Sequence, residues 1–293
     1  MSEIVVINRP TFAKQEYSES INIFYGINDK LTKRGLLYHF YHFYHDFLMV
    51  FYYYCYLNNL LGKKINLYMP KIYTCGNLSY IAEIEIPHLR MHEISNRQTF
   101  NREIVHNKLM INGSWKDNEV MYDGKEIINV WNNRPTTIPY NSIKNPTKHV
   151  LLIDRGLSNL GSISKSAVKS SRSLTNGKTR RSIQNMDSIE EEIKRAGYYV
   201  NRVTFEDLTF REQQKVFERV DIVIGQHGAG LVHLLDVKRN IKLIELPPIL
   251  GGHYKIICKR KKEIEYIDGS MLRKGGNKNH PIIDVKNLLK FIN

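Results

Sequence analysis

A glycine-rich segment between a buried strand pattern and a helix pattern carries the strongest chemical signal in the chain. It begins at Asp221, ends at Leu231 and contains the run His227-Gly228-Ala229-Gly230. Glycines let a backbone approach a ligand closely, and the free N–H groups at the start of a helix point toward an anion. The run therefore predicts a phosphate-binding turn. A turn that binds no ligand and packs His227 as a structural residue is the alternative. The spacing fits neither the dinucleotide fingerprint nor the P-loop.

A carboxylate follows on the next strand pattern. Glu245 stands near the end of the predicted strand from Lys242 to Leu246, shortly before Pro247 and Pro248. Ligands of parallel α/β sheets bind at the carboxyl ends of the strands. Glu245 is therefore expected to accept hydrogen bonds from the ribose of a nucleotide. The alternative is a strand-end glutamate on the surface.

The elements that must position these residues alternate along the second half of the chain. Strands are predicted at 149–154, 198–205, 221–225 and 242–246, and helices at 187–196, 210–218 and 229–236. Alternating strands and helices build a parallel sheet from βαβ units, with apolar strands covered on both faces. The fold class is therefore α/β, and Asp187 is expected to cap the first of these helices.

The first half is more mixed. Its patterns predict a long helix at 36–61 and short strands at 1–8, 65–69, 81–86 and 127–131. The apolar stretch 47–61 is shorter than the roughly 20 residues that span a bilayer, so a buried aromatic helix is expected. Prolines and polar residues between 135 and 148 mark a break, which divides the chain into an N-terminal domain, 1–145, and a C-terminal domain, 146–293. Ser, Lys, Asn and Gly dominate 156–178, which is expected to be a mobile insertion.

Five short motifs of the second half, in their order and approximate spacing, resemble glycosyltransferase family 61. They are Asp154-Arg155 after a strand, Arg181 to Asn185 before a helix, Phe205 to Phe210, His227 to Leu231, and Glu245 to Pro247. The resemblance points to the branches of the protein O-mannose N-acetylglucosaminyltransferases and the EGF-domain O-GlcNAc transferases. In the first half, the segment from Tyr41 to Leu48 resembles the family's His-x-x-x-Asp helix.

This resemblance implies a GT-B-like architecture, in which two Rossmann-like domains hold the active site in the cleft between them. It also implies inverting transfer of a sugar from a nucleotide sugar, here expected to be a UDP-sugar, to a hydroxyl of a glycan or glycoprotein. Neither a metal nor a cofactor other than this co-substrate is expected. The sequence agrees on the metal, because Asp-x-Asp, with which metal-dependent GT-A enzymes hold a divalent ion, occurs nowhere in the chain.

The implied donor-binding residues carry charge and hydrogen-bonding groups. They are Arg155, Arg181, Asn185, His227, Gly228, Ala229, Gly230 and Glu245. Without a metal, neutralisation of the diphosphate falls to the two arginines and to the amides of the glycine turn. Either arginine could instead be an ordinary surface cation, and Asn185 could cap the helix that follows it.

His42 and Asp46 are the expected catalytic pair of the N-terminal domain. They are four residues apart, so on a helix they share one face. A carboxylate orients an imidazole and raises its basicity, which is the arrangement that a general base needs. A purely structural pair on a crowded helix is the alternative. A metal site formed by His39, His42 and Asp46 is disfavoured, because ligands from a single helix rarely converge on one ion.

Two other classes of protein are alternatives to a glycosyltransferase. The chain has 43 Lys and Arg against 29 Asp and Glu, a net charge of +14, which favours polyanions and motivates a nucleic-acid-binding alternative. The basic residues are spread through the chain without a zinc-finger or RRM signature, so no nucleic-acid partner is expected. The second alternative is a pseudoenzyme that binds sugar nucleotides without turnover. Neither a signal peptide nor a membrane anchor is recognisable, and a cytoplasmic location is expected.

Overall fold

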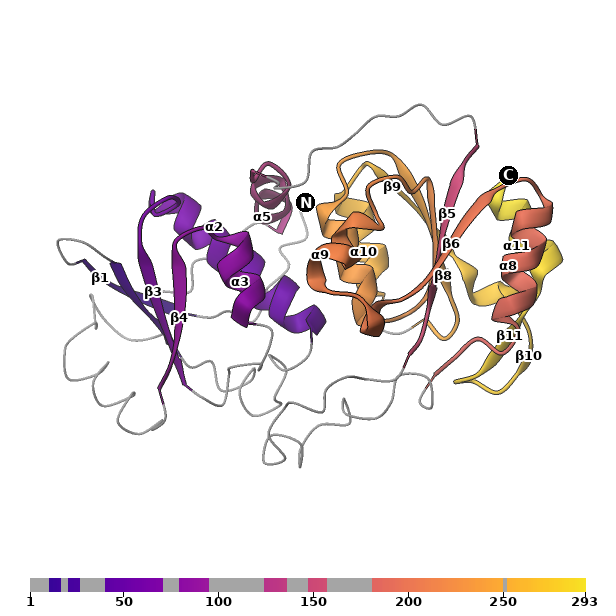
Figure 1. Ribbon diagram of the computed structural model, residues 1–293, viewed down its shortest axis with the longest axis horizontal. Helices are drawn as coiled ribbons and strands as arrows, with labels where there is room; N and C mark the ends of the chain where they lie inside the picture. The colour runs from indigo at the N-terminus through magenta and orange to yellow at the C-terminus, as the bar shows by residue number, and fades with distance from the viewer. Residues whose placement is uncertain are drawn as a thin grey trace, which may run out of the picture. The chain divides into compact units, whose positions relative to one another are not determined.

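The computed structural model describes residues 11–16, 21–26, 40–70, 79–94, 124–135, 147–156, 181–249 and 252–293 (Figure 1). They form two compact units: the N-terminal unit ends at Trp131 and the C-terminal unit begins at Asn132. The predicted domain boundary at 145/146, the predicted strand 1–8 and all of the segment 156–178 except Gly156 lie outside the described residues.

The N-terminal unit contains a sheet of four strands. In spatial order these are β1 (Thr11–Glu16), β2 (Ile21–Gly26), β3 (Ile65–Pro70) and β4 (Leu89–Ile94). β1 is antiparallel to β2, and the other neighbours are parallel. Helical segments connect each parallel pair, as βαβ units require. β3 confirms the predicted strand 65–69, whereas β1, β2 and β4 were not predicted from the sequence.

A helix rich in aromatic residues lies between β2 and β3 in the chain. It contains a π-helical section, η2 (His42–Leu48), followed by α2 (Met49–Leu57). Most of its described side chains are buried as far as Cys55, and the rings of Tyr44 and Tyr52 each meet Trp131 edge-on at 5.4 Å. The helix ends at Leu57, where Tyr56 and Leu57 are exposed, so the predicted buried aromatic helix is confirmed as far as residue 55. Within the part of the chain that the structure describes, no helix is both long and apolar enough to cross a membrane.

Two predicted strands of the first half are wrong, because both segments are helices. The segment 81–86 falls on α3 (Ser79–Glu85), and 127–131 falls on α5 (Gly124–Asn132). In α5 the buried residues are Ile127, Ile128 and Trp131, which recur at helical and not alternating spacing. Both segments are short and contain β-branched isoleucines, which favour strands, so the sequence predicted a strand in place of the helix.

The C-terminal unit is built on a sheet of five parallel strands. In spatial order these are β6 (Tyr199–Thr204), β5 (His149–Asp154), β7 (Ile222–Gln226), β8 (Ile241–Leu246) and β9 (Ile264–Asp268). All neighbouring strands are parallel. The first four confirm the predicted strands and, with them, the α/β class. Because β6 and β7 lie on opposite sides of β5, the sheet has the 2-1-3-4-5 order of doubly wound folds, with its switch point between β5 and β7.

Helices cover both faces of this sheet. Figure 1 shows α8 (Met186–Arg195) and α11 (Val285–Ile292) on one side, and α9 (Phe210–Lys215) and α10 (His253–Arg260) on the other. The central strands β5, β7 and β8 are buried along most of their length, as predicted for strands covered on both faces. The core between the sheet and α8 and α11 includes Val150, Leu152, Ile189, Ile224 and Leu288.

Smaller elements complete the unit and refine the predicted helices. The predicted helix 229–236 is the 3₁₀ helix η8 (Ala229–Asp236), and η7 (Phe205–Asp207) precedes α9. After β9 come η9 (Gly269–Leu272) and the antiparallel pair β10 (Arg273–Gly276) and β11 (Pro281–Ile283). The predicted cap at Asp187 is wrong: α8 begins one residue earlier, and the Asp187 carboxylate instead accepts a hydrogen bond from Arg202 at 2.5 Å.

One lysine of the C-terminal unit is buried. Lys261 is 1% exposed, and its Nζ donates to Asn132 Oδ1 at 2.9 Å, to the Leu235 carbonyl at 2.8 Å and to the Val237 carbonyl at 2.6 Å. These three acceptors match the three protons of an ammonium group. Burial nevertheless dominates and lowers the pKa of Lys261 to about 8.

Candidate functional site

Two predicted donor-binding residues meet at the switch point of the C-terminal sheet. Arg155 follows the end of β5, and His227 follows the end of β7. Ile153 and Gly225 are register partners in the parallel pair, so the residues that follow them leave the sheet side by side. Arg155 Nη2 donates a hydrogen bond to the His227 carbonyl. The structure thus places a guanidinium and an imidazole where open α/β sheets bind their ligands.

The glycines of the turn have neighbours within the chain. A Cβ at Gly228 would lie 2.5 Å from Arg155 Nη2, and a Cβ at Gly230 would overlap the ring of Phe205. The φ angle of Gly228 is −172°, so its conformation is open to any residue. Space therefore requires glycine at position 230, where the packed Phe205 ring blocks a side chain, whereas at position 228 a side chain would displace the guanidinium of Arg155. Contact of the amides from Gly228 to Gly230 with a phosphate stays a prediction.

The carbonyl group of Gly228 is also held in place. Tyr254 Oη donates to it at 2.5 Å, and the Leu231 N–H donates at 3.1 Å as the first bond of η8. Tyr254 comes from α10, which sequence reasoning did not recognise. The turn is thus fixed by groups from β5, α10 and its own helix before any ligand is present. Fixed donors of this kind need no reorganisation when an anion arrives.

The side chain of His227 is held by Glu245. His227 Nδ1 lies 2.6 Å from Glu245 Oε1, and Tyr266 Oη donates to Glu245 Oε2 at 2.7 Å. Glu245 is fully buried, whereas the side chain of His227 is 14% exposed. Burial, and then the hydrogen bond to Glu245, raise the pKa of Tyr266, so this phenol remains a neutral donor. The three residues form a chain of hydrogen bonds that runs from Tyr266 through the buried Glu245 to His227 at the sheet edge.

These contacts bear on the alternatives for Glu245. Its side chain is buried, so an ordinary surface glutamate is the wrong description. Both of its oxygens are engaged by His227 and Tyr266. A hydrogen bond from Glu245 to a ribose hydroxyl stays a prediction, and the structure gives this carboxylate partners within the protein.

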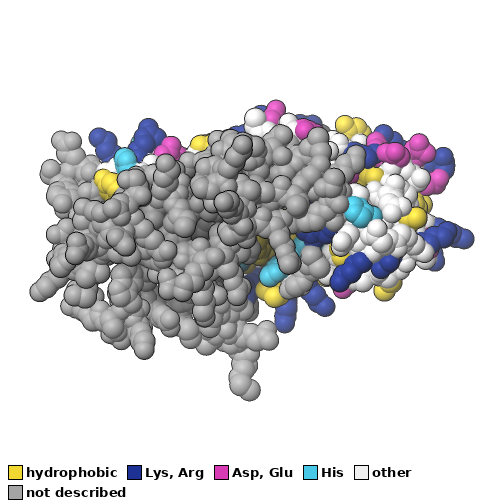
Figure 2. Space-filling model, turned by 90° about the horizontal axis from the view of Figure 1, so that it is seen from below, with side chains coloured by type: hydrophobic (Ala, Val, Ile, Leu, Met, Phe, Trp, Pro, Cys, Tyr) yellow, Lys and Arg dark blue, Asp and Glu magenta, His cyan; other side chains and the backbone are white. Residues whose placement is uncertain are grey.

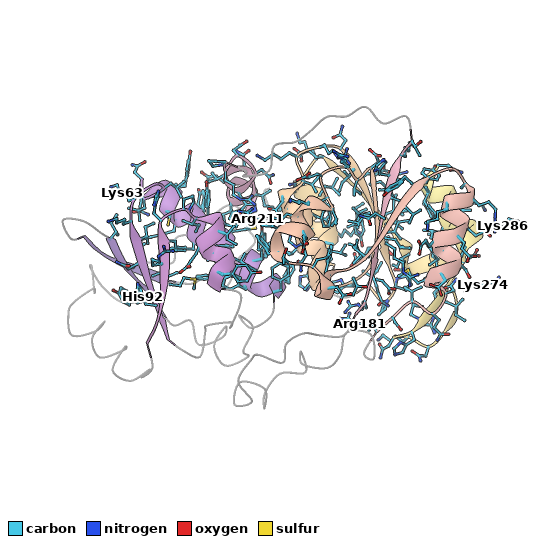
Figure 3. All side chains as sticks on the ribbon, viewed as in Figure 1. Lys63, His92, Arg181, Arg211, Lys274 and Lys286 are labelled. Carbon is cyan, nitrogen blue, oxygen red and sulfur yellow. The ribbon has the colours of Figure 1, made fainter. Side chains whose placement is uncertain are left out.

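Arg181 and Asn185 precede α8 and differ in their surroundings. Figure 3 shows Arg181 near the end of the sheet at which β5 ends. Arg181 is 8% exposed and is therefore not an ordinary surface cation. Asn185 occupies the N-cap position of α8 but makes no side-chain cap bond. Its Nδ2 donates to the Ile283 carbonyl at 2.8 Å and its Oδ1 accepts from the Ile283 N–H at 2.9 Å. Asn185 thus fastens β11 to the start of α8.

The predicted catalytic pair lies in the π-helical section of the N-terminal unit. The structure gives the backbone of His42 and Asp46 there, so their catalytic role stays a prediction. The Met49 N–H bonds to the carbonyl of Tyr44, five residues earlier, as in a π-helix. Such sections are rare and occur frequently at functional sites.

Sequence reasoning missed Tyr254 and Tyr266. Tyr266 lies on β9, where Leu243 is its register partner and Asp268 is the partner of Glu245. Recognition of the alternating run Ile264–Asp268 as the next parallel strand would have placed Tyr266 on the same face as Glu245. Across the described ranges, no group of three or more His, Cys, Asp or Glu is arranged to hold a metal ion.

A doubly wound parallel sheet with a guanidinium, an imidazole and a glycine turn at its switch point places the C-terminal unit among the α/β ligand-binding folds. The family model described as "Glycosyltransferase 61" matches residues 40–244, which is more than half of the chain. The chain belongs to glycosyltransferase family 61, as its five motifs predicted, and this membership indicates glycosyl transfer.

A curated relative shares a short part of the chain. The EGF domain-specific O-linked N-acetylglucosamine transferase of Drosophila melanogaster is 45% identical over 49 residues, which are 17% of this chain and 9% of that protein. The chain thus matches less than a tenth of the length of this relative. The match agrees with the family but does not identify the sugar donor or the acceptor of this chain.

Proposed function

We propose that this chain is an inverting glycosyltransferase that uses a UDP-sugar, without a bound metal, to glycosylate a hydroxyl of a glycan or glycoprotein. Family membership supports the class of reaction. The observation that carries the donor site is the meeting of Arg155 with the turn at His227 and Gly228 at the carboxyl edge of the sheet. The EGF domain-specific relative, by its name, transfers N-acetylglucosamine, which makes UDP-N-acetylglucosamine the first donor to test.

In this proposal the C-terminal unit stabilises the leaving diphosphate. Negative charge grows on the diphosphate as the sugar–phosphate bond breaks, so donors fixed in advance lower the barrier. Arg155 supplies a guanidinium, His227 supplies its Nε2, and the turn supplies backbone amides. Arg181 adds a second cation, itself buried, near the same edge of the sheet. These groups replace the divalent ion of metal-dependent enzymes.

The N-terminal unit would supply the base. We propose a GT-B arrangement of the two units, with His42 as the general base and Asp46 orienting it. His42 removes the proton of the acceptor hydroxyl, the hydroxyl oxygen bonds to the anomeric carbon, and the nucleoside diphosphate leaves from the opposite face. A single displacement of this kind inverts the anomeric configuration. An imidazole suits the base because it titrates near neutral pH.

Ion pairs on part of the described surface count against the nucleic-acid alternative. Arg202 is paired with Asp154, Asp187 and Glu190. Lys194 also pairs with Glu190. In Figure 2, basic and acidic side chains are intermixed at one end of the described surface. A protein that binds a polyanion through counterion release needs unpaired cations along one face.

A panel of nucleotide sugars tests the proposal. The chain is incubated with UDP-, GDP- and CMP-sugars, and thermal shift and release of free nucleotide are recorded. We expect a UDP-sugar to stabilise the protein by about 2.7 kcal/mol at a hundred times its Kd. Stabilisation without nucleotide release, even with a panel of glycan and peptide acceptors, indicates the pseudoenzyme. No response to any nucleotide sugar contradicts the proposal.

A further inference from the structure

We propose that Glu245 and Tyr266 are positioning residues, which hold the imidazole of His227 so that its Nε2 faces the donor diphosphate. This inference rests on the proposed function, since it assigns roles within the same donor site. This role takes the place of the predicted contact between Glu245 and the ribose, because both carboxylate oxygens are engaged within the protein, and Tyr266 has no contact with the donor either. They act through His227, the member of the chain that reaches the partly exposed edge of the sheet.

The first step fixes the tautomer. Glu245 Oε1 is the partner of His227 Nδ1 at 2.6 Å. A carboxylate accepts hydrogen bonds only, so Nδ1 must carry a hydrogen. The other ring nitrogen, Nε2, then carries either a lone pair or a second hydrogen. Among the described residues Nε2 has no hydrogen-bond partner, so it remains for a ligand, and in the imidazolium form it donates to a phosphate oxygen.

The second step fixes the carboxylate. Glu245 is fully buried and would be costly to leave with a single partner. Tyr266 Oη donates to its other oxygen at 2.7 Å. Tyr266 is a neutral donor over the whole physiological range, because burial and this hydrogen bond raise its pKa. The carboxylate therefore cannot rotate without losing a hydrogen bond, and Oε1 stays aimed at His227.

The third step confines the ring and its backbone. The ring of Tyr254 meets the imidazole of His227 nearly edge-on at 5.2 Å between centroids, and the ring of His253 lies 6.1 Å away. Arg155 holds the His227 carbonyl, and Tyr254 Oη holds the carbonyl of Gly228. Both the main chain and the side chain of His227 are thus fixed, which is the preorganisation that charge stabilisation needs.

The tautomer of His227 in the whole chain tests this inference. Long-range ¹H–¹⁵N correlation spectra are recorded without nucleotide, well above the ordinary imidazole pKa of about 6.5. His227→Gln identifies the signals of His227. We expect the neutral wild-type ring to carry its hydrogen on Nδ1. A hydrogen on Nε2 in the wild type would overturn the proposal.

Glu245→Gln sharpens the test. An amide has one accepting oxygen, and Tyr266 occupies it, so the NH₂ group must face His227 and donate to Nδ1. We expect the hydrogen of His227 to move to Nε2 in Glu245→Gln and to return to Nδ1 in the double variant Glu245→Gln/Tyr266→Phe, where the amide is free to turn. An unchanged tautomer in the single variant would show that Tyr266 does not orient residue 245.

Nucleotide titration completes the experiment, with UDP as the probe. Tyr266→Phe should weaken UDP binding about tenfold, the cost of one misplaced charge-assisted hydrogen bond. Tyr198→Phe is the matched control, because it removes another tyrosine hydroxyl that donates a hydrogen bond, from Tyr198 Oη to Asn293 at 2.8 Å. The affinity of this variant for UDP should be unchanged. Equal affinities in both variants overturn the positioning role. A wild type that binds no nucleotide contradicts the proposed function instead, and the tautomer results separate the two failures.

Discussion

Gly228 and Gly230 lie two residues apart in one turn, yet alanine should affect them in different ways. A Cβ at Gly230 would meet Phe205, which is 7% exposed and packs against Phe217 at 6.0 Å and His233 at 5.7 Å. The ring cannot move without disturbing this cluster. Overpacking of a core costs about 1–3 kcal/mol, and alanine recovers up to roughly 1 kcal/mol through its helix propensity. We expect Gly230→Ala to lose about 1–2 kcal/mol of unfolding free energy.

Gly228→Ala should instead disturb the site. Its Cβ would meet the far end of Arg155, a long side chain that can turn toward solvent. The lost hydrogen bond is offset by the lower entropy of the unfolded alanine chain, so stability should change by less than about 1 kcal/mol. The guanidinium, however, leaves the carbonyl of His227. We therefore expect UDP affinity to fall about tenfold in Gly228→Ala.

Thermal unfolding and UDP titration of both variants measure this contrast. Gly230→Ala should lower Tm by roughly 2–8 °C, at about 2–4 °C for each kcal/mol, and bind UDP nearly as the wild type does below its Tm. Gly228→Ala should keep its Tm and lose affinity. Equal losses of Tm in the two variants, or full UDP affinity in Gly228→Ala, would refute the assignment of Arg155 and Phe205 as the reasons for these glycines.

Three further variants address the rest of the chain. The pKa of Lys261 is lowered in the folded state, so the unfolded state binds more protons between pH 8 and pH 10.5. The unfolding free energy should therefore rise with pH across that range by up to roughly 3 kcal/mol. Urea unfolding measures this rise, and Lys261→Met should lack it. Asn185→Ala should lower unfolding free energy by about 1–3 kcal/mol and expose the Ile283 amide to hydrogen exchange, and unchanged exchange would contradict its role as a fastener. His42→Ala should reduce turnover about 10²–10⁴-fold with UDP affinity intact, whereas the exposed control His92→Ala should retain activity; wild-type turnover in His42→Ala would make the pair structural.

The central strands of the C-terminal sheet were predictable because burial on both faces leaves a continuous apolar run. β5 and β7 read this way, and an aspartate or a glycine ends each run, whereas in β8 only Leu243 and Ile244 are apolar between Lys242 and Glu245. The position of Arg155 beside the glycine turn follows from this pattern, because carboxyl ends of parallel strands meet at one edge. The helices α3 and α5 were not predictable in the same way, since seven and nine residues show too little of a 3.6-residue period.

Partners far apart in the sequence explain the rest of what was missed. Asn185 reads as a helix cap, and only the fold brings it to Ile283, 98 residues away. Glu245 reads as a ligand-facing carboxylate, and only the placement of β9 shows that Tyr266 occupies it. In both cases the local pattern identified a polar residue with a specific partner, and the tertiary structure decided which partner it was.

The central claim about the molecule is that the donor diphosphate binds beside Arg155. Calorimetric titration of UDP into the wild type, Arg155→Ala and Arg195→Ala measures this. Arg195 is the matched control, because it lies on the last turn of α8 with a side chain that is 69% exposed. Loss of a charge-assisted contact with a phosphate should weaken binding about 10- to 100-fold in Arg155→Ala and leave Arg195→Ala unchanged. Wild-type UDP affinity in Arg155→Ala would contradict a donor site at the switch point between β5 and β7.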